Sequence, residues 1–499
     1  MGIVIKQGII GTIIIYIGIA LGFANVIWLF PRFFETDEFG LRTLLTDNVS
    51  ILAQFSLFGL TSSILKFFPF FEDKEGARKG YTSFMLIAYI IFFSFFSFIY
   101  YVFIEAFFIQ SYVGNSPLFV KYSYLIIPLL FLYTFNVLLE AIMKSWYNIV
   151  WSNFTREVLT RVLTTVIIFF FAFSFISFDQ FWIAFVMIYG VNSLTLLSVL
   201  IKTKKIEFSI KKESLQKPFL KQFLVYSFFS FLVGAGSILV LKIDVSMIGQ
   251  LLSETEVGIY AMAIFFATII DIPRRAIVQI TSPIVSKLWK ENDYEGLKSI
   301  YKKTSINLQL AGSLLFLLIW INIDDLYAFI PNNSDYLQGK YVVFFLGIAK
   351  LSDMLFSVNA DIIVFSARYK MNLVFNLTLA ALTIITNYFF IQLWGITGAA
   401  IATTLSITLV NMIRFIYIKR AFQLSPFQWN NSWLMLFSLL IFAIGMFLKP
   451  NLHFIVNVFI NSTLIVGAFA LLVYKTSISE DAKAVLKKGL SFVFKTLKN

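Results

Sequence analysis

Long apolar runs constrain this chain more than any other feature of its sequence. Stretches of roughly 18 or more residues with few or no charges recur along its whole length, and a helix of about 20 apolar residues can cross a hydrocarbon core of about 30 Å. Of the 499 residues, 59% are hydrophobic and only 13% are charged. That is too little charge to cover the surface of a soluble protein of this length. The sequence therefore predicts an all-α polytopic membrane protein.

We predict about fourteen transmembrane helices from these runs. The first run follows Lys6 without a strongly basic region and lacks a small-residue cleavage site, so we expect an uncleaved first span rather than a signal peptide. The expected spans are 8–30, 44–68, 82–104, 118–139, 157–178, 181–201, 219–241, 257–284, 304–322, 340–366, 371–393, 396–418, 432–448 and 453–474.

Basic residues set the expected orientation of these spans. Most of the 40 Lys and Arg residues fall in every second loop or at the adjoining helix ends, and loops of this kind face the cytoplasm. This distribution predicts cytoplasmic N- and C-termini, with the loops 202–218 and 285–303 on the same side. The net charge of +13 is explained by basic clusters that face anionic lipid, so we expect no nucleic-acid partner.

The chain offers little material for metal or redox chemistry. It has no cysteine and a single histidine, His453, so disulfides and thiolate metal sites are excluded. We expect His453 to be an interfacial residue rather than a catalytic one, and we expect no cofactor, no metal and no catalytic residue. The segment 476–499 places apolar residues among lysines, which predicts a basic amphipathic helix on the inner membrane surface. A frayed basic tail is the alternative.

One short phrase occurs twice. ETDEFGLRTL begins at Glu35 and SETEVGIYAM begins at Ser253, and in each an acidic run precedes an apolar residue, a glycine and a long hydrophobic stretch. Acidic residues suit a helix N-terminus because they complement the helix dipole, and Gly40 and Gly258 permit a tight turn or close packing. Both phrases follow odd-numbered spans, which predicts two parallel repeats related by an axis along the membrane normal. Chance similarity is the alternative.

The repeat predicts how the chain is divided. The expected parts are an N-terminal six-helix lobe (1–215), a C-terminal six-helix lobe (216–430), two additional transmembrane helices (431–475) and the basic tail (476–499).

Four stretches of the sequence resemble a known family. They are DEFGL at 37–41, LFGLTSSILKFFP at 57–69, LVLKIDVSMIGQLLSETEVGIYAMA at 239–263 and WGITGAAIATTLSITL at 394–409. These stretches look like the polysaccharide-exporter branch of the multidrug/oligosaccharidyl-lipid/polysaccharide (MOP) flippase superfamily, which includes Wzx-type O-antigen flippases. The resemblance covers residues from about 5 to 475.

The resemblance implies a transporter rather than an enzyme. It implies two six-helix lobes around a central cavity, with alternating access that carries an undecaprenyl-diphosphate-linked oligosaccharide from the cytoplasmic to the outer leaflet of the bacterial inner membrane. This step serves surface polysaccharides such as the O-antigen of lipopolysaccharide. The implied partners are the lipid-linked glycan, membrane lipids, a coupling cation (Na⁺ or H⁺) and the polysaccharide polymerase machinery.

A related substrate is less supported by the sequence. The peptidoglycan-precursor flippases of the superfamily use cationic cavity residues in their first spans. Here the first span is uncharged until Arg32.

Charges inside the membrane are the best candidates for a site, because each is costly unless it faces water or a partner. The tenth span is the richest. Lys350, Asp353, Ser357, Asp361 and Arg368 all lie within about 60° of Lys350 around a regular helix. In the functional interpretation this face lines the cavity, with the lysine attracting a diphosphate and the aspartates serving a coupling ion. The structural alternative is a set of ion pairs along the helix or between lobes.

Weaker candidates lie on the second and seventh spans. Lys242 and Asp244 are about 200° apart around their helix, so at least one of them needs a partner on another element. Lys66 is near the inner end of its span, where it either snorkels to the surface or faces the cavity. We expect Lys350, Lys242 and Lys66 to bind the diphosphate, and Asp353, Asp361 and Asp244 to bind the coupling ion or tune that charge.

Two other polar groups have a simpler explanation. Glu140 and Lys144 are four residues apart on one helix, which predicts a structural ion pair. Asp271, Arg274 and Arg275 surround Pro273. Proline removes one helical hydrogen bond, so Pro273 is the candidate hinge for a rocking movement.

Two alternative functions remain open. A membrane glycosyltransferase or polymerase would handle the same lipid carrier, and the acidic residues Glu35, Asp37 and Glu38 are of the kind that its outer loop would use. Such enzymes usually carry large outer loops, which this chain lacks, and the acidic run recurs at 254–256, where a helix start explains it. A multidrug/cation antiporter of the same superfamily would share the two-lobe plan and differ only in substrate.

Overall fold

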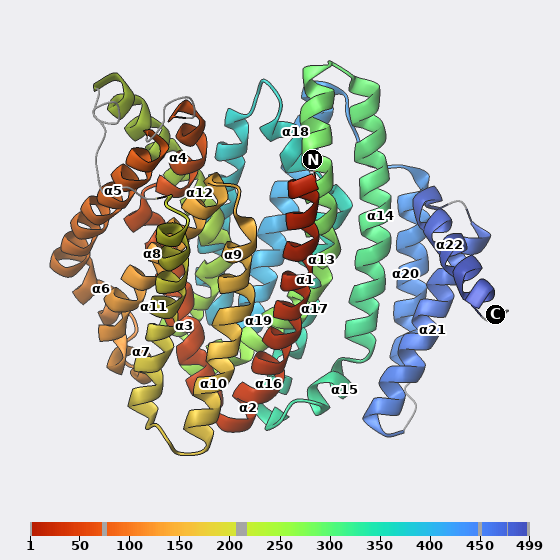
Figure 1. Ribbon diagram of the computed structural model, residues 1–499. Coiled ribbons are helices and arrows are strands. Elements are labelled where there is room, and N and C mark those ends of the chain that lie inside the picture. The colour runs from red at the N-terminus through yellow and green to blue at the C-terminus, as the bar shows by residue number, and fades with distance from the viewer. Residues whose placement is uncertain (1, 72–76, 206–216, 448–451, 477, 497–499) are drawn as a thin grey trace. The chain divides into compact units, whose positions relative to one another are not determined.

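The computed structural model describes residues 2–71, 77–205, 217–447, 452–476 and 478–496 (Figure 1). These residues are predominantly helical and include no β-strand, which confirms the predicted all-α class. By its internal contacts the chain divides into two compact units, Met1–Gly258 and Ile259–Asn499. Each is described by itself below.

Unit 1 is built from α-helices with short π-helical and 3₁₀ segments between them. Its elements are α1 (Gly2–Phe23), η1 (Ala24–Leu29), α2 (Phe30–Phe33), α3 (Thr36–Leu57), α4 (Leu60–Phe67), η2 (Phe68–Phe71), α5 (Ala77–Ile99), η3 (Tyr100–Ile104), α6 (Glu105–Gln110), α7 (Pro117–Lys121), η4 (Ser123–Leu125), α8 (Ile126–Ser145), α9 (Ile149–Asn153), η5 (Phe154–Leu159), α10 (Thr160–Ala172), α11 (Phe178–Lys202), α12 (Lys217–Leu251) and the first residues of α13 (Glu254–Lys290).

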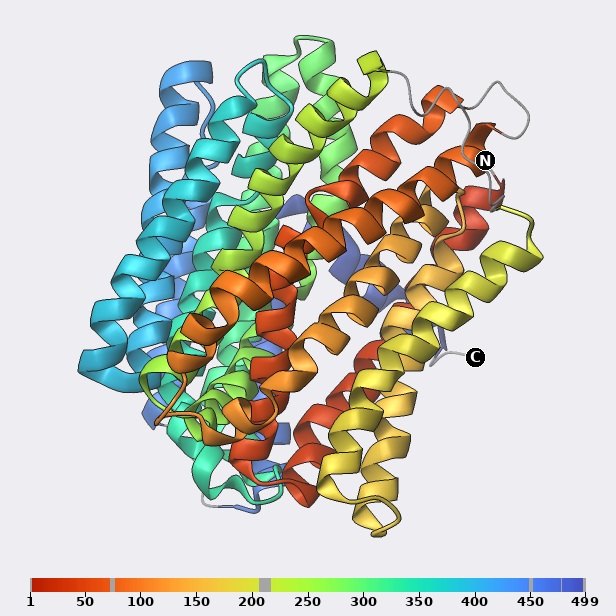
Figure 2. The same ribbon diagram turned by 90° about the vertical axis from the view of Figure 1, so that its left-hand side faces the viewer.

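The helix α8 lies at the centre of unit 1. It packs against α3, α4, α5 and α11, and many of its inward side chains are apolar and fully covered, as at Leu130, Leu138 and Leu139. The helices α10 and α11 form a hairpin (Figure 2). The helix α12 runs along α3 and α4. The predicted boundary at 215/216 therefore differs from the boundary between the compact units, and the division into repeats stays a prediction.

The two acidic phrases both begin helices, as predicted. At the start of α3, the backbone N–H of Glu35 donates to Glu38 Oε2 at 2.8 Å, and together the two residues form a capping box. At the start of α13, the backbone N–H of Glu256 donates to the hydroxyl of Ser253 at 3.2 Å. Each cap satisfies N–H groups that the first helical turn leaves without a partner.

The glycines of the two phrases pack against each other. A Cβ atom added at Gly40 would lie 1.8 Å from the carbonyl oxygen of Glu254, and one added at Gly258 would lie 2.1 Å from the carbonyl oxygen of Thr36. The contact is reciprocal, because each glycine meets the residue four positions before the other. Only residues without a side chain allow backbones to approach so closely. The starts of α3 and α13 therefore lie side by side.

Three π-helical segments interrupt the long helices of unit 1, at η1, η3 and η5. The helix that contains η1 packs against α10, which follows η5. The side-chain amide of Asn25 donates to the carbonyl oxygen of Arg161 at 2.9 Å, and its oxygen accepts from Thr165 at 2.7 Å. Next to this contact, Gly18 and Gly22 of α1 leave room for the Arg161 side chain. Such segments often occur at functional sites.

Unit 2 continues α13 and adds ten further elements. They are α14 (Tyr294–Ile321), α15 (Ile323–Ala328), α16 (Asn333–Tyr336), η7 (Leu337–Gly339), α17 (Lys340–Phe356), α18 (Asn359–Val364), α19 (Lys370–Phe422), α20 (Trp429–Phe447), α21 (Phe454–Lys475) and α22 (Glu480–Thr496).

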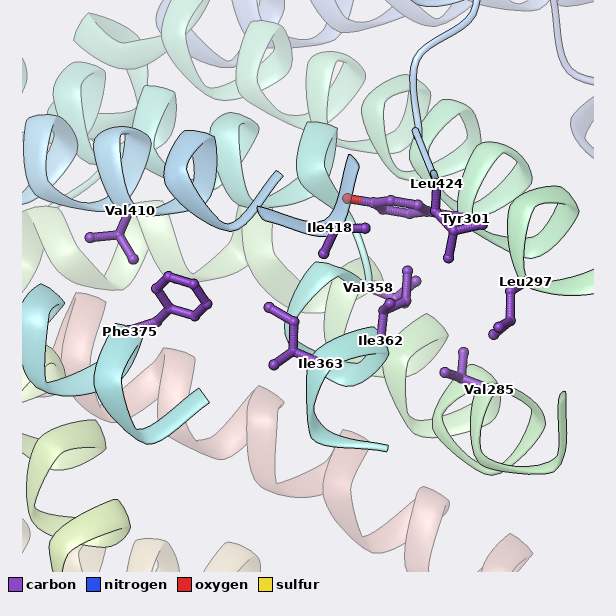
Figure 3. Packing of buried hydrophobic residues seen from close by; sticks show 10 residues of the cluster. All are labelled: Val285, Leu297, Tyr301, Val358, Ile362, Ile363, Phe375, Val410, Ile418 and Leu424. Atoms are coloured by element: carbon purple, nitrogen blue, oxygen red, sulfur yellow. The ribbon is translucent and has the colours of Figure 1, made fainter. Parts of the chain in front are cut away.

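The core of unit 2 lies where α13, α14, α18 and α19 meet (Figure 3). Tyr301 of α14 is fully buried there among aliphatic side chains. The helix α14 also packs against α17, α20 and α21, while α22 packs against α21. The tail is therefore helical as far as Thr496, and its placement on a membrane surface stays a prediction.

Two breaks interrupt long helices of unit 2. Between α17 and α18 the chain leaves the helix at Ser357, whose φ of 52° is left-handed. Within α19, Trp394 and Gly395 have non-helical angles, and this break separates the two spans predicted at 371–393 and 396–418. The helix α13, in contrast, continues through Pro273 and Pro283.

The described residues contain ten helices that are long and apolar enough to cross a membrane, or eleven if the bent pair α3 and α4 is one span. The predicted spans 157–178 and 340–366 correspond to helical segments that are not among these. A polytopic helical architecture is therefore confirmed, while the count of fourteen stays a prediction.

Candidate functional site

A cluster of charged side chains lies inside unit 2, on α13, α17, α18 and α19. Asp271 of α13 is only 3% exposed and accepts hydrogen bonds from Arg274 Nε and Arg275 Nε, both at 2.9 Å. Lys350 of α17 also acts electrostatically on the Asp271 carboxylate. A buried carboxylate of this kind is stable only with such partners.

Asp353 is the second carboxylate of this cluster. Its Oδ1 accepts from Asn411 Nδ2 of α19 at 2.7 Å, and the amide oxygen of Asn411 accepts from Asn359 Nδ2 of α18 at 3.1 Å. Arg274 and Arg414 both act electrostatically on Asp353. This chain of polar groups ties α19 to the two helices on either side of the break.

The break itself is held by hydrogen bonds. Ser357 N donates to the carbonyl oxygen of Asp353 at 2.9 Å, and Ser357 Oγ donates to Thr304 Oγ1 at 2.6 Å. A non-glycine residue in the left-handed region is strained by about 1–3 kcal/mol and persists only where its surroundings fix it. Within membranes, irregular backbone of this kind is found where it is buried in protein or lines a cavity.

The break corrects one sequence prediction. Lys350, Asp353, Ser357, Asp361 and Arg368 were expected on one face of a single regular helix. The helix α17 instead ends at Phe356, Asp361 lies on the separate α18, and Arg368 lies beyond the end of α18. The side chains still come together in part, because Asp361 interacts with Ser282 and Arg274 of α13.

This cluster carries a small excess of positive charge. Its cations are Arg274, Arg275, Lys350 and Arg414, and its carboxylates are Asp271, Asp353 and Asp361. Carboxylates and cations that interact within one polar group allow it both to attract an anion and to exchange a cation or proton.

The other predicted cations have partners within unit 1. Lys242 Nζ of α12 binds Asp47 Oδ1 of α3 at 2.7 Å, so the prediction that this helix needs a partner on another element is confirmed. Asp244 is buried on the same helix. The exposed ammonium of Lys66 lies 3.7 Å from the ring centroid of Tyr226, a cation–π contact.

A cavity of about 510 Å³ lies within unit 1, between α4, α8, η5, α10 and α11. The Glu140 Oε2 atom in its wall binds Lys144 at 3.6 Å and Arg156 Nη1 at 3.4 Å. The predicted pair of Glu140 and Lys144 is thus present, and Arg156 extends it to a third residue. Glu140 is buried, whereas both cations are partly exposed.

Sequence reasoning missed two arginines on the helices of unit 1, Arg42 and Arg156. Arg42 lies over the ring of Phe30, 4.9 Å from its centroid. From the sequence, Arg42 was placed in the first outer loop, because the predicted apolar span begins only after it, at residue 44. Arg156 lies in a stretch, 152–157, whose polar residues ended the apolar run. An i, i+4 pattern of charges, as at Glu157 and Arg161, was the available signal that the helix extends through it.

The described residues contain no group of three or more His, Asp or Glu side chains that could hold a metal ion. His453 lies immediately before α21, at a helix end as predicted.

Comparisons with known proteins show which solved structures share this architecture. No family model matches the chain, and no curated protein matches its sequence. Among solved structures it is similar to a lipid II flippase, MurJ, in an inward closed conformation, with a TM-score of 0.73 and 15% identity over 94% of this chain and 99% of that chain.

Transporters are also among the similar structures. An inward-facing multidrug resistance MATE family transporter of the MOP superfamily matches with a TM-score of 0.63 and 16% identity over 81% of this chain and 94% of that chain. A MOP superfamily transporter from Pyrococcus furiosus matches with a TM-score of 0.57 and 15% identity over 84% of this chain and 95% of that chain. The chain therefore has the fold that a lipid flippase and transporters of the MOP superfamily share.

Proposed function

We propose that this protein flips an undecaprenyl-diphosphate-linked oligosaccharide from the cytoplasmic to the outer leaflet of the bacterial inner membrane. The glycan would then enter surface-polysaccharide biosynthesis, as in the assembly of an O-antigen or lipopolysaccharide. The fold shared with a lipid II flippase supports a lipid-linked substrate. The four stretches of sequence that resemble polysaccharide exporters support the choice of glycan.

The observation that carries this proposal is the charged cluster of unit 2. A diphosphate must lose much of its hydration to cross a membrane, and a cation inside a protein attracts it several-fold more strongly than a cation in water does. The cluster offers Lys350, Arg274, Arg275 and Arg414 for this purpose. Their carboxylate partners keep the cluster nearly neutral when no substrate is bound.

The carboxylates of this cluster are the proposed coupling groups. Asp353 and Asp361 each interact with Arg274, so a diphosphate that binds this arginine competes with them. A carboxylate released in this way can take up a proton or Na⁺, which would link substrate movement to ion movement. Asp244 of α12 is the proposed counterpart in unit 1. Alternating access, with Pro273 as a hinge and both termini in the cytoplasm, completes the mechanism.

Deletion of the gene followed by lipid analysis tests the function directly. We expect an undecaprenyl-diphosphate oligosaccharide to accumulate on the cytoplasmic side while surface polysaccharide is lost. Re-expression of the wild-type chain should restore export. A deletion strain with normal surface polysaccharide and no accumulated lipid would contradict the proposal.

A multidrug/cation antiporter is the second candidate, because MATE transporters share the fold. The same deletion strain separates the two functions. An antiporter would leave the lipid-linked glycans unchanged, and its loss would make cells more sensitive to cationic drugs.

A further inference from the structure

The cavity of unit 1 has features that the cluster of unit 2 does not explain. Ten of the thirteen residues that line its volume of about 510 Å³ have polar side chains. Small-molecule sites usually enclose between about 300 and 1,000 Å³ and are mostly apolar with a few polar groups. Most of the surface that these residues expose to the cavity is nevertheless apolar, so the cavity fits a ligand that combines apolar faces with hydrogen-bonding groups.

Two asparagines in the wall each have an atom without a partner. Asn136 of α8 is 6% exposed and Asn192 of α11 is 2% exposed, yet Asn136 Nδ2 and Asn192 Oδ1 make no hydrogen bond. Buried polar atoms are nearly always paired, and leaving one unpaired is costly. One of these atoms is a donor and the other an acceptor, which is the combination that a hydroxyl group can satisfy.

The charged groups of the cavity wall belong to an alternating chain of three cations and two carboxylates. Glu140 binds both Lys144 and Arg156, and Arg156 Nε also binds Glu157 Oε1 at 3.1 Å. Glu157 in turn binds Arg161, whose guanidinium lies against α1. Each charge of this chain has at least one opposite partner, so the wall offers ionised donors and acceptors, which form strong hydrogen bonds to neutral polar groups.

Two aromatic rings complete the wall. Tyr133 and Tyr189 both line the cavity, and their ring centroids are 5.7 Å apart in an edge-to-face arrangement. Tyrosine rings combine an apolar face with a polar tip. A sugar ring has the matching properties, with C–H groups on its faces and hydroxyl groups around its edge.

We propose that this cavity binds one neutral sugar ring of the transported glycan. Its hydroxyl groups would pair with the side-chain amides of Asn136 and Asn192, which would turn toward the ligand because their unpaired atoms have almost no accessible surface, and a tyrosine ring would cover one face. The role of the site in transport rests on the proposed flippase function, whereas binding itself does not. The site would let unit 1 select the glycan.

The test is a binding measurement on the purified full-length protein in lipid nanodiscs, because many detergents carry sugar headgroups. The probes are the methyl glycosides of glucose, galactose and N-acetylglucosamine, with methyl glucuronide and inorganic diphosphate as charged comparisons. Saturation-transfer NMR measures each affinity. We expect at least one neutral glycoside to bind in the millimolar range and to bind more tightly than either charged probe.

Matched variants connect this binding to the cavity. Asn136→Leu and Asn192→Leu should each weaken the glycoside by about tenfold, the effect of one lost hydrogen bond. Asn115→Leu is the control, because the Nδ2 atom of Asn115 already donates to the carbonyl oxygen of Gln250 at 2.6 Å. The affinity of this variant for the glycoside should equal that of the wild type. The melting temperature of Asn136→Leu should stay the same or rise, because the variant removes an unpaired donor.

Several results would overturn the proposal. They are the absence of glycoside binding to the wild type, equal loss in Asn115→Leu, and tighter binding of diphosphate or glucuronide that Asn136→Leu weakens. A failure of the flippase function looks different, since the deletion strain would then accumulate no lipid-linked glycan while the glycoside still bound the purified protein.

Discussion

Single charged side chains decide most of what this chain can do, and Lys350 is the most informative of them. It acts on the buried Asp271 carboxylate, which two arginines already hold. The Asp271 carboxylate would therefore keep two cationic partners if Lys350 were removed. This leaves the lysine available for a substrate.

We expect Lys350→Ala to lower glycan export at least tenfold while expression and melting temperature stay near those of the wild type. Lys350→Arg should keep part of the activity because the positive charge remains. Export of lipid-linked glycan in the complemented deletion strain measures both. Lys340→Ala is the control on the same helix, since Lys340 is bound to Asp324 at 2.5 Å. Normal export by Lys350→Ala, or its failure to fold, would make Lys350 a structural residue.

Lys242 is expected to behave differently, because it binds Asp47 directly. Removing one partner of a mostly buried ion pair leaves the other charge without compensation and costs roughly 3 kcal/mol. Lys242→Met should therefore lower the melting temperature and the yield of folded protein. The double variant Lys242→Met with Asp47→Leu should recover both. If the double variant is folded but does not export glycan, Lys242 also serves the substrate.

At the level of helices and turns, the start of α3 beside the start of α13 is the contact that the structure defines most sharply. Its two glycines meet the carbonyl oxygens of Glu254 and Thr36. A methyl group at either glycine cannot be accommodated by a rotamer change, because the obstructing atoms belong to the backbone.

We expect Gly40→Ala to destabilise the protein by several kcal/mol or to prevent its folding, because the new Cβ atom would overlap the Glu254 carbonyl. Gly467→Ala in α21 is the matched control. A Cβ atom there meets nothing within 4 Å, and alanine favours a helix interior by up to about 1 kcal/mol over glycine. Thermal unfolding of both purified variants compares them. Equal stability of the two variants would contradict this account of the contact.

Helix starts could be predicted from the sequence, whereas helix breaks could not. The acidic residues identified the beginnings of α3 and α13, because a first turn needs such partners whatever surrounds it. Ser357 carries no such signal. Its left-handed conformation depends on Thr304 and on the hydrogen bonds of Asp353, which only tertiary packing brings together. The same reason hid the partnership of Lys242 with Asp47.

The orientation of the whole molecule in the membrane is a prediction that rests on its basic residues. Reporter fusions at Lys212, which lies outside the described residues, and at Asn431, at the start of α20, should both report a cytoplasmic location. The reason is that translocation of a Lys- and Arg-rich loop is disfavoured. A fusion after Gly114 is the control and should report the periplasm. A periplasmic signal from Lys212 or Asn431 would reverse the orientation or change the number of spans.

The whole-molecule fold was predictable because apolar runs and short loops leave a chain few alternatives to a helical bundle in lipid. The candidate site was predictable only in part. Lys350, Asp353 and Asp361 were identified because charges stand out in apolar runs, while Arg414 near Asp353 and the cavity around Asn136 were not. Their proximity comes from helices that are far apart in the sequence.

The π-helical segments η1, η3 and η5 have a consequence for how related sequences should be aligned. A π-helical turn amounts to one residue inserted into an α-helix. Deleting one residue from a regular helix turns all that follows by about 100°, but deleting one from η5 would convert it to an α-turn and largely keep the register of α10. Relatives of this chain are therefore expected to carry single-residue gaps at 24–29, 100–104 and 154–159, within helices rather than in the loops between them.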